Sequence, residues 1–109
     1  MRGELDIQPM VTVVTLHGEL DMLTVDSLRQ LLAAACFGDP DRVVVDLNDV
    51  PFVDVLSLST ILATADSLRE RGATLTVVGA SSAVRRICAL LNAEDVLVPM
   101  LPMPRAAAN

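Results

Sequence analysis

Residues 42–62 have the sequence RVVVDLNDVPFVDVLSLSTIL, in which a strand is followed by a helix. The run from Val43 to Val45 is continuously apolar, as expected for a central strand that is covered on both faces. Asp54 stands where the helix begins, and from Leu58 onward apolar residues recur at helical spacing. A strand, a short connection and a helix in this order predict an α/β fold with the strand inside a parallel sheet.

The residues before this stretch predict two strands and a helix. Leu5 and Ile7 alternate with polar residues, which indicates a short half-buried strand, and residues 11–16 form a second strand rich in β-branched side chains. Pro9 lies between them, so we expect a hairpin or a sharp corner there. Thr24 is a suitable N-cap for the helix that follows. The apolar stripe of that helix comprises Leu28, Leu31, Leu32 and Ala35.

The residues after this stretch predict another strand and a third helix. Residues 75–78 form the strand, Ser81 or Ser82 caps the helix, and Asn92 suits a left-handed exit from it. Residues 96–98 form a candidate last strand. The order is therefore ββαβαβα with an optional final strand. We expect a mixed, mostly parallel sheet of four to five strands with three or four helices, and the first strand antiparallel at one side.

Composition limits the chain to one domain. Its 109 residues suffice for a single core, and the 52% of apolar residues, with no Trp or Tyr, make that core aliphatic. We expect a domain over residues 1–98 and a flexible Pro/Ala-rich tail over residues 99–109, which lacks a packing period. No apolar run is long enough for direct membrane insertion, and the N-terminus does not resemble a signal peptide, which favours the cytoplasm.

Charge and reactive side chains favour a binding protein over an enzyme. The net charge of −6 argues against a nucleic-acid surface and suits either a soluble protein in general or one that meets a basic protein partner. His17 is the only histidine, and it has neither the neighbours of a metal site nor the pattern of a nucleophile–His–acid set. We therefore expect no catalytic residue, no metal and no cofactor. Cys36 and Cys88 lie on helical stripes, where free cysteine behaves as a small hydrophobe; a redox pair is the alternative.

Two short motifs carry a family resemblance. Gly18-Glu19-Leu20-Asp21 ends a strand, and about thirty residues later Phe52-Val53-Asp54 opens a helix. With these motifs the chain resembles, from Leu5 to Val98, the STAS domain, which is the fold of bacterial anti-sigma factor antagonists. In that family a loop of pattern Asp-Ser-Ser-Gly-Leu carries a phosphorylatable serine. The same five places here are Asp54-Val55-Leu56-Ser57-Leu58, so a leucine occupies the usual phosphoacceptor position.

The resemblance implies a regulatory binding module of transcription. Such a module binds a kinase-like anti-sigma factor and so frees a sigma factor. The contact residues that it implies are Asp21, Thr24, Asp54, Val55, Leu56 and Ser57. For Asp21 the alternative is that it stabilises a local turn or cap. The alternative function that it implies is an accessory subunit of a membrane transport ATPase complex.

The start of the second helix leaves two questions open. Val55 and Leu56 lie off the buried stripe, so they are partly exposed unless one of them tucks under the preceding loop as a staple. Ser57 and Ser59 could accept phosphate in a shifted register, and Thr60 is a further candidate. The plainer interpretation is that they are ordinary serines at a helix start.

Overall fold

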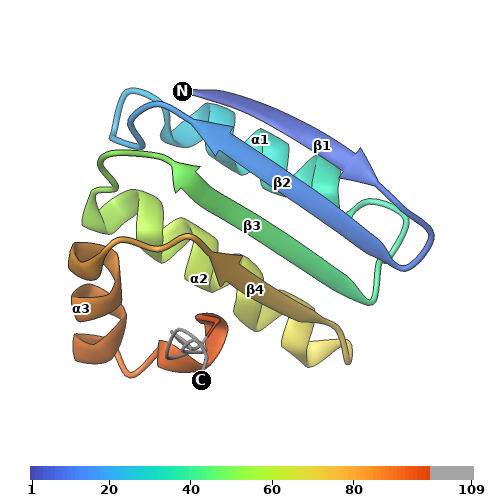
Figure 1. Cartoon of the computed structure of the whole chain (residues 1–109). Helices are drawn as coiled ribbons and strands as arrows, with labels where there is room; N and C mark the ends of the chain where they lie inside the picture. The colour runs from blue at the N-terminus through green and yellow to red at the C-terminus, as the bar shows by residue number, and fades with distance from the viewer. Residues whose placement is uncertain (99–109) are drawn as a thin grey trace, which may run out of the picture.

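The computed structural model describes residues 1–98 (Figure 1). The elements follow the predicted order ββαβαβα. They are β1 (Arg2–Ile7), β2 (Val11–His17), α1 (Val25–Cys36), β3 (Arg42–Asp49), α2 (Val55–Glu70), β4 (Thr74–Val78) and α3 (Ser82–Leu90), followed by a short 3-10 helix, η1 (Glu94–Val96). The predicted tail over residues 99–109 lies outside the described residues. Within that described part, no helix has the length and apolar character needed to cross a membrane.

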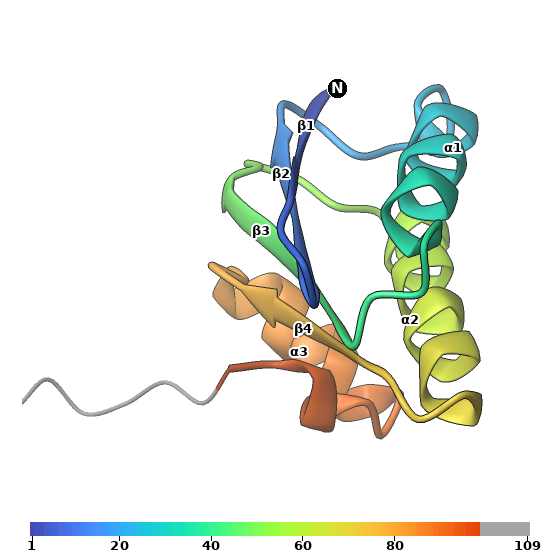
Figure 2. The same ribbon diagram turned by 90° about the vertical axis from the view of Figure 1, so that its right-hand side faces the viewer.

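The four strands form one mixed sheet in the order β1-β2-β3-β4. The first strand pairs antiparallel with β2, whereas β2, β3 and β4 are parallel to one another, as predicted. The helices α1 and α2 lie side by side on one face of the sheet, and α3 lies beside β4 (Figure 2). This arrangement follows from right-handed crossovers between parallel strands.

The core is aliphatic and lies between the sheet and the first two helices. The strands contribute Val14, Leu16, Val43, Val45, Leu47, Leu75 and Val77, and the helices contribute Leu28, Leu32, Leu58, Ile61 and Leu68. The prediction that β3 is covered on both faces is wrong in one respect. Val43 and Val45 are fully buried, but Val44 between them is only half-buried. Its side chain points away from α1 and α2, because successive residues of a strand face opposite sides.

Local hydrogen bonds fix the helix starts. The Asp54 carboxylate accepts from the Ser57 N–H at 2.7 Å, which confirms the predicted N-cap of α2. The Ser81 hydroxyl caps α3 in the same way by accepting from the Val84 N–H. Thr24 stands at the predicted N-cap position of α1, but its side chain makes no capping hydrogen bond. Thr24 already has a near-helical backbone, so its hydroxyl turns back into the preceding loop instead.

The chain after α3 differs from the predicted fifth strand. Asn92 leaves α3 with φ of 58°, in the left-handed region that was expected. Residues 94–96 then form η1, and Leu97 makes an isolated parallel bridge with Val77. The Val98 N–H donates to the Val77 carbonyl at 3.1 Å. Because only this single bridge follows the 3-10 turn, the described part of the chain contains four strands.

Candidate partner-binding site

Two loops leave the carboxyl end of the parallel strands and are fastened to each other. Loop 18–24 follows β2 and loop 50–54 follows β3. The Leu20 N–H donates to the Phe52 carbonyl at 2.9 Å, and the Asp54 N–H donates to the Leu20 carbonyl at 2.9 Å. The two motifs that are about thirty residues apart in the sequence therefore form one backbone unit at one end of the sheet.

Loop 18–24 is braced from within. The Asp21 N–H donates to the Thr24 hydroxyl at 3.1 Å, and the Asp21 carboxylate accepts from the Leu23 N–H at 3.0 Å. Asp21 and Thr24, which were predicted as contact residues, are only half-buried and shape the turn. The turn projects Met22 and Leu23, whose side chains are 72% and 91% exposed. Sequence reasoning missed both, although an apolar pair that belongs to no helical stripe was a signal.

The start of α2 presents further apolar side chains beside this turn. Val55 is 56% exposed and Leu56 is 44% exposed, so neither is tucked away as a buried staple. We define the loop patch as the exposed apolar residues of the two loops and the α2 start. They are Met22, Leu23, Phe52, Val55 and Leu56. Exposed apolar side chains that gather at one end of a small protein often mark an interaction surface.

The two candidate serines lie in opposite environments. Ser57 is fully buried, and its hydroxyl has no hydrogen-bond partner among residues 1–98. Neither a partner protein nor a kinase reaches such a hydroxyl in the folded chain, so the structure disagrees with both expectations for Ser57. Ser59 is exposed, whereas the neighbouring Thr60 hydroxyl donates to the Leu56 carbonyl at 2.9 Å. Only Ser59 of the two serines is therefore accessible.

The single histidine has partners that the sequence did not suggest. His17 contacts Asp49 and Glu4, rather than the acids that follow it in loop 18–24. The two cysteines differ in exposure: Cys36 is half-buried and Cys88 is buried. Burial raises the pKa of both thiols. A raised pKa keeps a thiol protonated and unreactive, which favours the packing role over the redox role.

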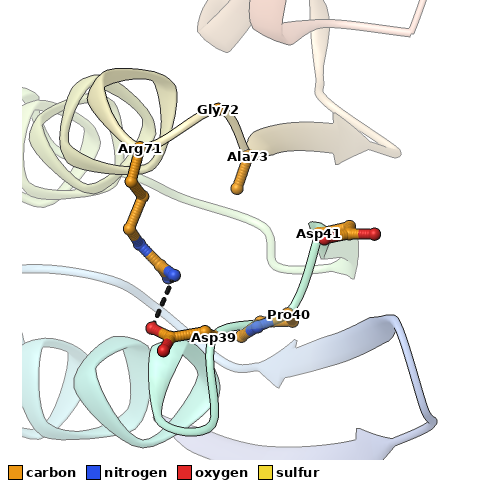
Figure 3. A pocket seen from close by; sticks show the side chains of 6 residues that line it. All are labelled: Asp39, Pro40, Asp41, Arg71, Gly72 and Ala73. Atoms are coloured by element: carbon orange, nitrogen blue, oxygen red, sulfur yellow. Dashed lines mark hydrogen bonds and ion pairs between the residues drawn. The ribbon is translucent and has the colours of Figure 1, made fainter.

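A hollow of about 370 Å³ lies at the opposite end of the sheet, where β3 and β4 begin. Arg71 after α2 reaches across it to Asp39 after α1, with 2.7 Å between Nη1 and Oδ1 (Figure 3). This ion pair connects the ends of two helices and lies in solvent, where such pairs contribute little. The hollow contains none of the predicted site residues.

The chain belongs to the STAS domain family, whose model matches residues 3–105. It is 30% identical over 107 residues to the anti-sigma-F factor antagonist RsfA of Mycobacterium tuberculosis, covering 94% of this chain and 83% of that protein. It is 26% identical over 84 residues to RsfB of the same organism, also an anti-sigma-F factor antagonist, covering 77% of this chain and 68% of that protein.

Solved structures share the fold. The crystal structure of an anti-sigma factor antagonist from Mycobacterium paratuberculosis superposes with a TM-score of 0.78 at 29% identity, covering 97% of this chain and 92% of that one. The unphosphorylated anti-sigma factor antagonist SpoIIAA superposes with a TM-score of 0.77 over 96% of both chains. At 18% identity the likeness to SpoIIAA is one of fold alone.

Proposed function

We propose that this chain is an anti-sigma factor antagonist, a binding module that sequesters an anti-sigma factor and thereby frees a sigma factor in the cytoplasm. The observation that carries the proposal is the loop patch, whose five exposed apolar side chains come from the α2 start and from two loops joined by backbone hydrogen bonds. Membership of the STAS family and the similarity to RsfA and RsfB support it.

The loop patch has the make-up of a binding surface. Leu23 is 91% exposed, so covering its side chain with a partner would lower the free energy of the complex by removing apolar surface from water. The same two loops carry three acids, of which Glu19 is exposed and Asp21 and Asp54 are half-buried, so we propose that they form part of a polar rim. Together with the net charge of −6, this rim favours a partner with a basic contact surface. We propose that this partner is a kinase-like anti-sigma factor.

Phosphate control of the usual kind would be absent at position 56, because leucine has no hydroxyl. The fully buried Ser57 is a poor substitute, since phosphorylation would require the helix start to open. Ser59 remains the accessible candidate for a shifted phosphorylation site. We propose that the unmodified chain is permanently competent to bind unless Ser59 is phosphorylated.

The alternative, an accessory subunit of a membrane transport ATPase, has no observation of its own in its favour. The fold also resembles part of the murine anion transporter Slc26a9, with a TM-score of 0.69 and 15% identity over 88% of this chain and 17% of the transporter. At that identity the likeness concerns the fold alone.

Affinity purification from the native cells tests the proposal. The bait is the full chain, and the matched control is the Leu56→Asp variant, which places a charge in the loop patch at a helix start that tolerates it. We expect wild type to retain an anti-sigma factor, identified by mass spectrometry, and Leu56→Asp to lose it. Recovery of a transport ATPase by both baits would contradict the proposal.

A further inference from the structure

The imidazole of His17, at the end of β2, lies between two carboxylates. Nδ1 is 2.5 Å from Asp49 Oδ2, and Nε2 is 3.2 Å from Glu4 Oε1. Glu4 belongs to β1 and Asp49 is the last residue of β3, so one ring connects three neighbouring strands. A carboxylate only accepts hydrogen bonds, so both contacts form when both ring nitrogens carry a proton. We name His17, Glu4 and Asp49 the histidine clasp.

The clasp lies where the regular pairing of β2 with β3 is interrupted. The strands pair in register as far as Thr15 and Asp46, and the next pair is His17 with Asp49. Two residues of β3 therefore lie opposite one residue of β2, which is the arrangement of a β-bulge. The Gly18 N–H then donates to the Asp49 carbonyl at 3.1 Å. Beyond the bulge, the contact between the His17 and Asp49 side chains therefore adds to this backbone hydrogen bond in holding the two strand ends together.

Both loops of the candidate site begin directly after the clasp. Loop 18–24 follows His17, and loop 50–54 follows Asp49. We propose that His17 is a positioning residue for partner binding: the doubly protonated ring holds the ends of β2 and β3, and with them the loop patch, in the arrangement that binds the anti-sigma factor. The identity of the partner rests on the proposed function, whereas the effect on the loops is a property of the chain alone.

The charged groups around the ring set the direction of its pH dependence. Glu4 and Arg2 face it from β1 and Asp49 from β3, while the backbone of Met1 lies beside Gly18. Hydrogen bonds to Asp49 and then to Glu4 raise the pKa of His17 above its ordinary value of 6.5, against smaller opposing effects of burial and Arg2. The contribution of the clasp is therefore complete below pH 6.5 and is lost as the pH rises through the raised pKa.

The first experiment uses the free, full-length chain. Because His17 is the only histidine, its ring resonance is unambiguous in an NMR titration. The titration midpoint should fall in Asp49→Asn and stay unchanged in Asp6→Asn, a control acid on β1 that contacts Gln8 instead. Should Asp49→Asn fail to fold, Glu4→Gln gives the same comparison. A midpoint that is equal in wild type and in the clasp variants would overturn the proposal.

Amide hydrogen exchange then measures whether the clasp orders the loops. The amides of Leu20 and Asp54 form the hydrogen bonds between the two loops. After correction for the intrinsic exchange rate, their protection in wild type should fall as His17 loses its proton, and in His17→Gln it should be independent of pH. Protection that does not follow the titration in wild type would overturn the proposal, whatever the partner is.

A binding experiment then measures the affinity of the chain for the anti-sigma factor recovered by the purification described above. The affinity of wild type should fall as the pH is raised through the His17 titration, and this fall should be about fivefold larger than the fall in His17→Gln. A factor of about five is the lower end of typical coupling between two sites. Equal pH dependence in both proteins would overturn the positioning role. If no anti-sigma factor binds at any pH, the proposed function fails, and the exchange result still decides whether the clasp orders the loops.

Discussion

Leu56→Asp separates a surface role of the α2 start from a core role. Leu56 is 44% exposed, so about half of the 1.5–3 kcal/mol that a fully buried leucine contributes is at stake, or about 1 kcal/mol. The new carboxylate lies in the first turn of α2, where its interaction with the helix dipole stabilises the fold by about 0.3–1 kcal/mol. The free energy of unfolding should therefore fall by less than about 1 kcal/mol, which is a shift of a few degrees in Tm.

The matched control is Leu58→Ala, two residues further along the same helix. Leu58 is fully buried in the core, and such a truncation costs about 2–5 kcal/mol. Thermal and urea unfolding of both variants, followed by circular dichroism, gives the comparison. Leu56→Asp should nevertheless weaken anti-sigma factor binding by about thirtyfold or more, because the loss of a central interface residue costs at least about 2 kcal/mol.

Two results would refute this reasoning, each in a different way. If Leu56→Asp unfolds the chain as readily as Leu58→Ala, then Leu56 belongs to the core and the loop patch has been misassigned. If the fold and the affinity are both unchanged, the partner binds elsewhere on the chain.

Three further predictions concern the same molecule. Ser57→Ala removes a buried hydroxyl that has no hydrogen-bond partner among the described residues. The free energy of unfolding, measured by urea titration, should therefore stay the same or rise by up to about 1 kcal/mol. A fall of more than about 1 kcal/mol would show that the hydroxyl is hydrogen-bonded in solution. Leu56→Ser should gain phosphate at position 56 when incubated with the cognate kinase and ATP, and phosphopeptide mass spectrometry of wild type should show none at Ser57. Gly79→Ala should destabilise more than Gly72→Ala although both glycines have positive φ, because a methyl group at 79 would lie 2.5 Å from Asn48 and one at 72 meets open space; equal values of Tm would contradict this.

Most of the fold could be predicted from patterns formed by residues that are close together in the sequence. The cap at Asp54 depends on a contact three residues away, and the stripes of α1 and α2 depend on helical periodicity, so both follow from local sequence. Thr24 shows the limit of such patterns. Its residue type suits a helix cap and a turn equally well, and the backbone of the whole loop decided between them.

Two features of the candidate site were beyond sequence reasoning. Ser57 stands four residues before Ile61 and therefore on the buried stripe of α2. Its burial was not predicted, because a buried helix face is recognised from apolar residues and serine is polar. The contacts of His17 depend on the register of three strands and on a bulge between two of them. A one-residue change in that register would turn the side chains to the other face of the sheet, so no local pattern specifies the clasp.

The bridge between Leu20 and Val53 joins the two loops, and it makes the degradation rate of this chain depend on the concentration of its partner. The loop patch is assembled from both loops, so it exists only in the native state, and a short peptide copied from one loop lacks half of it. A partner that binds only the native state stabilises it, by about 2.7 kcal/mol when its free concentration is one hundred times Kd. Cellular proteases cleave the open chain, so the turnover of this protein should slow as its partner accumulates.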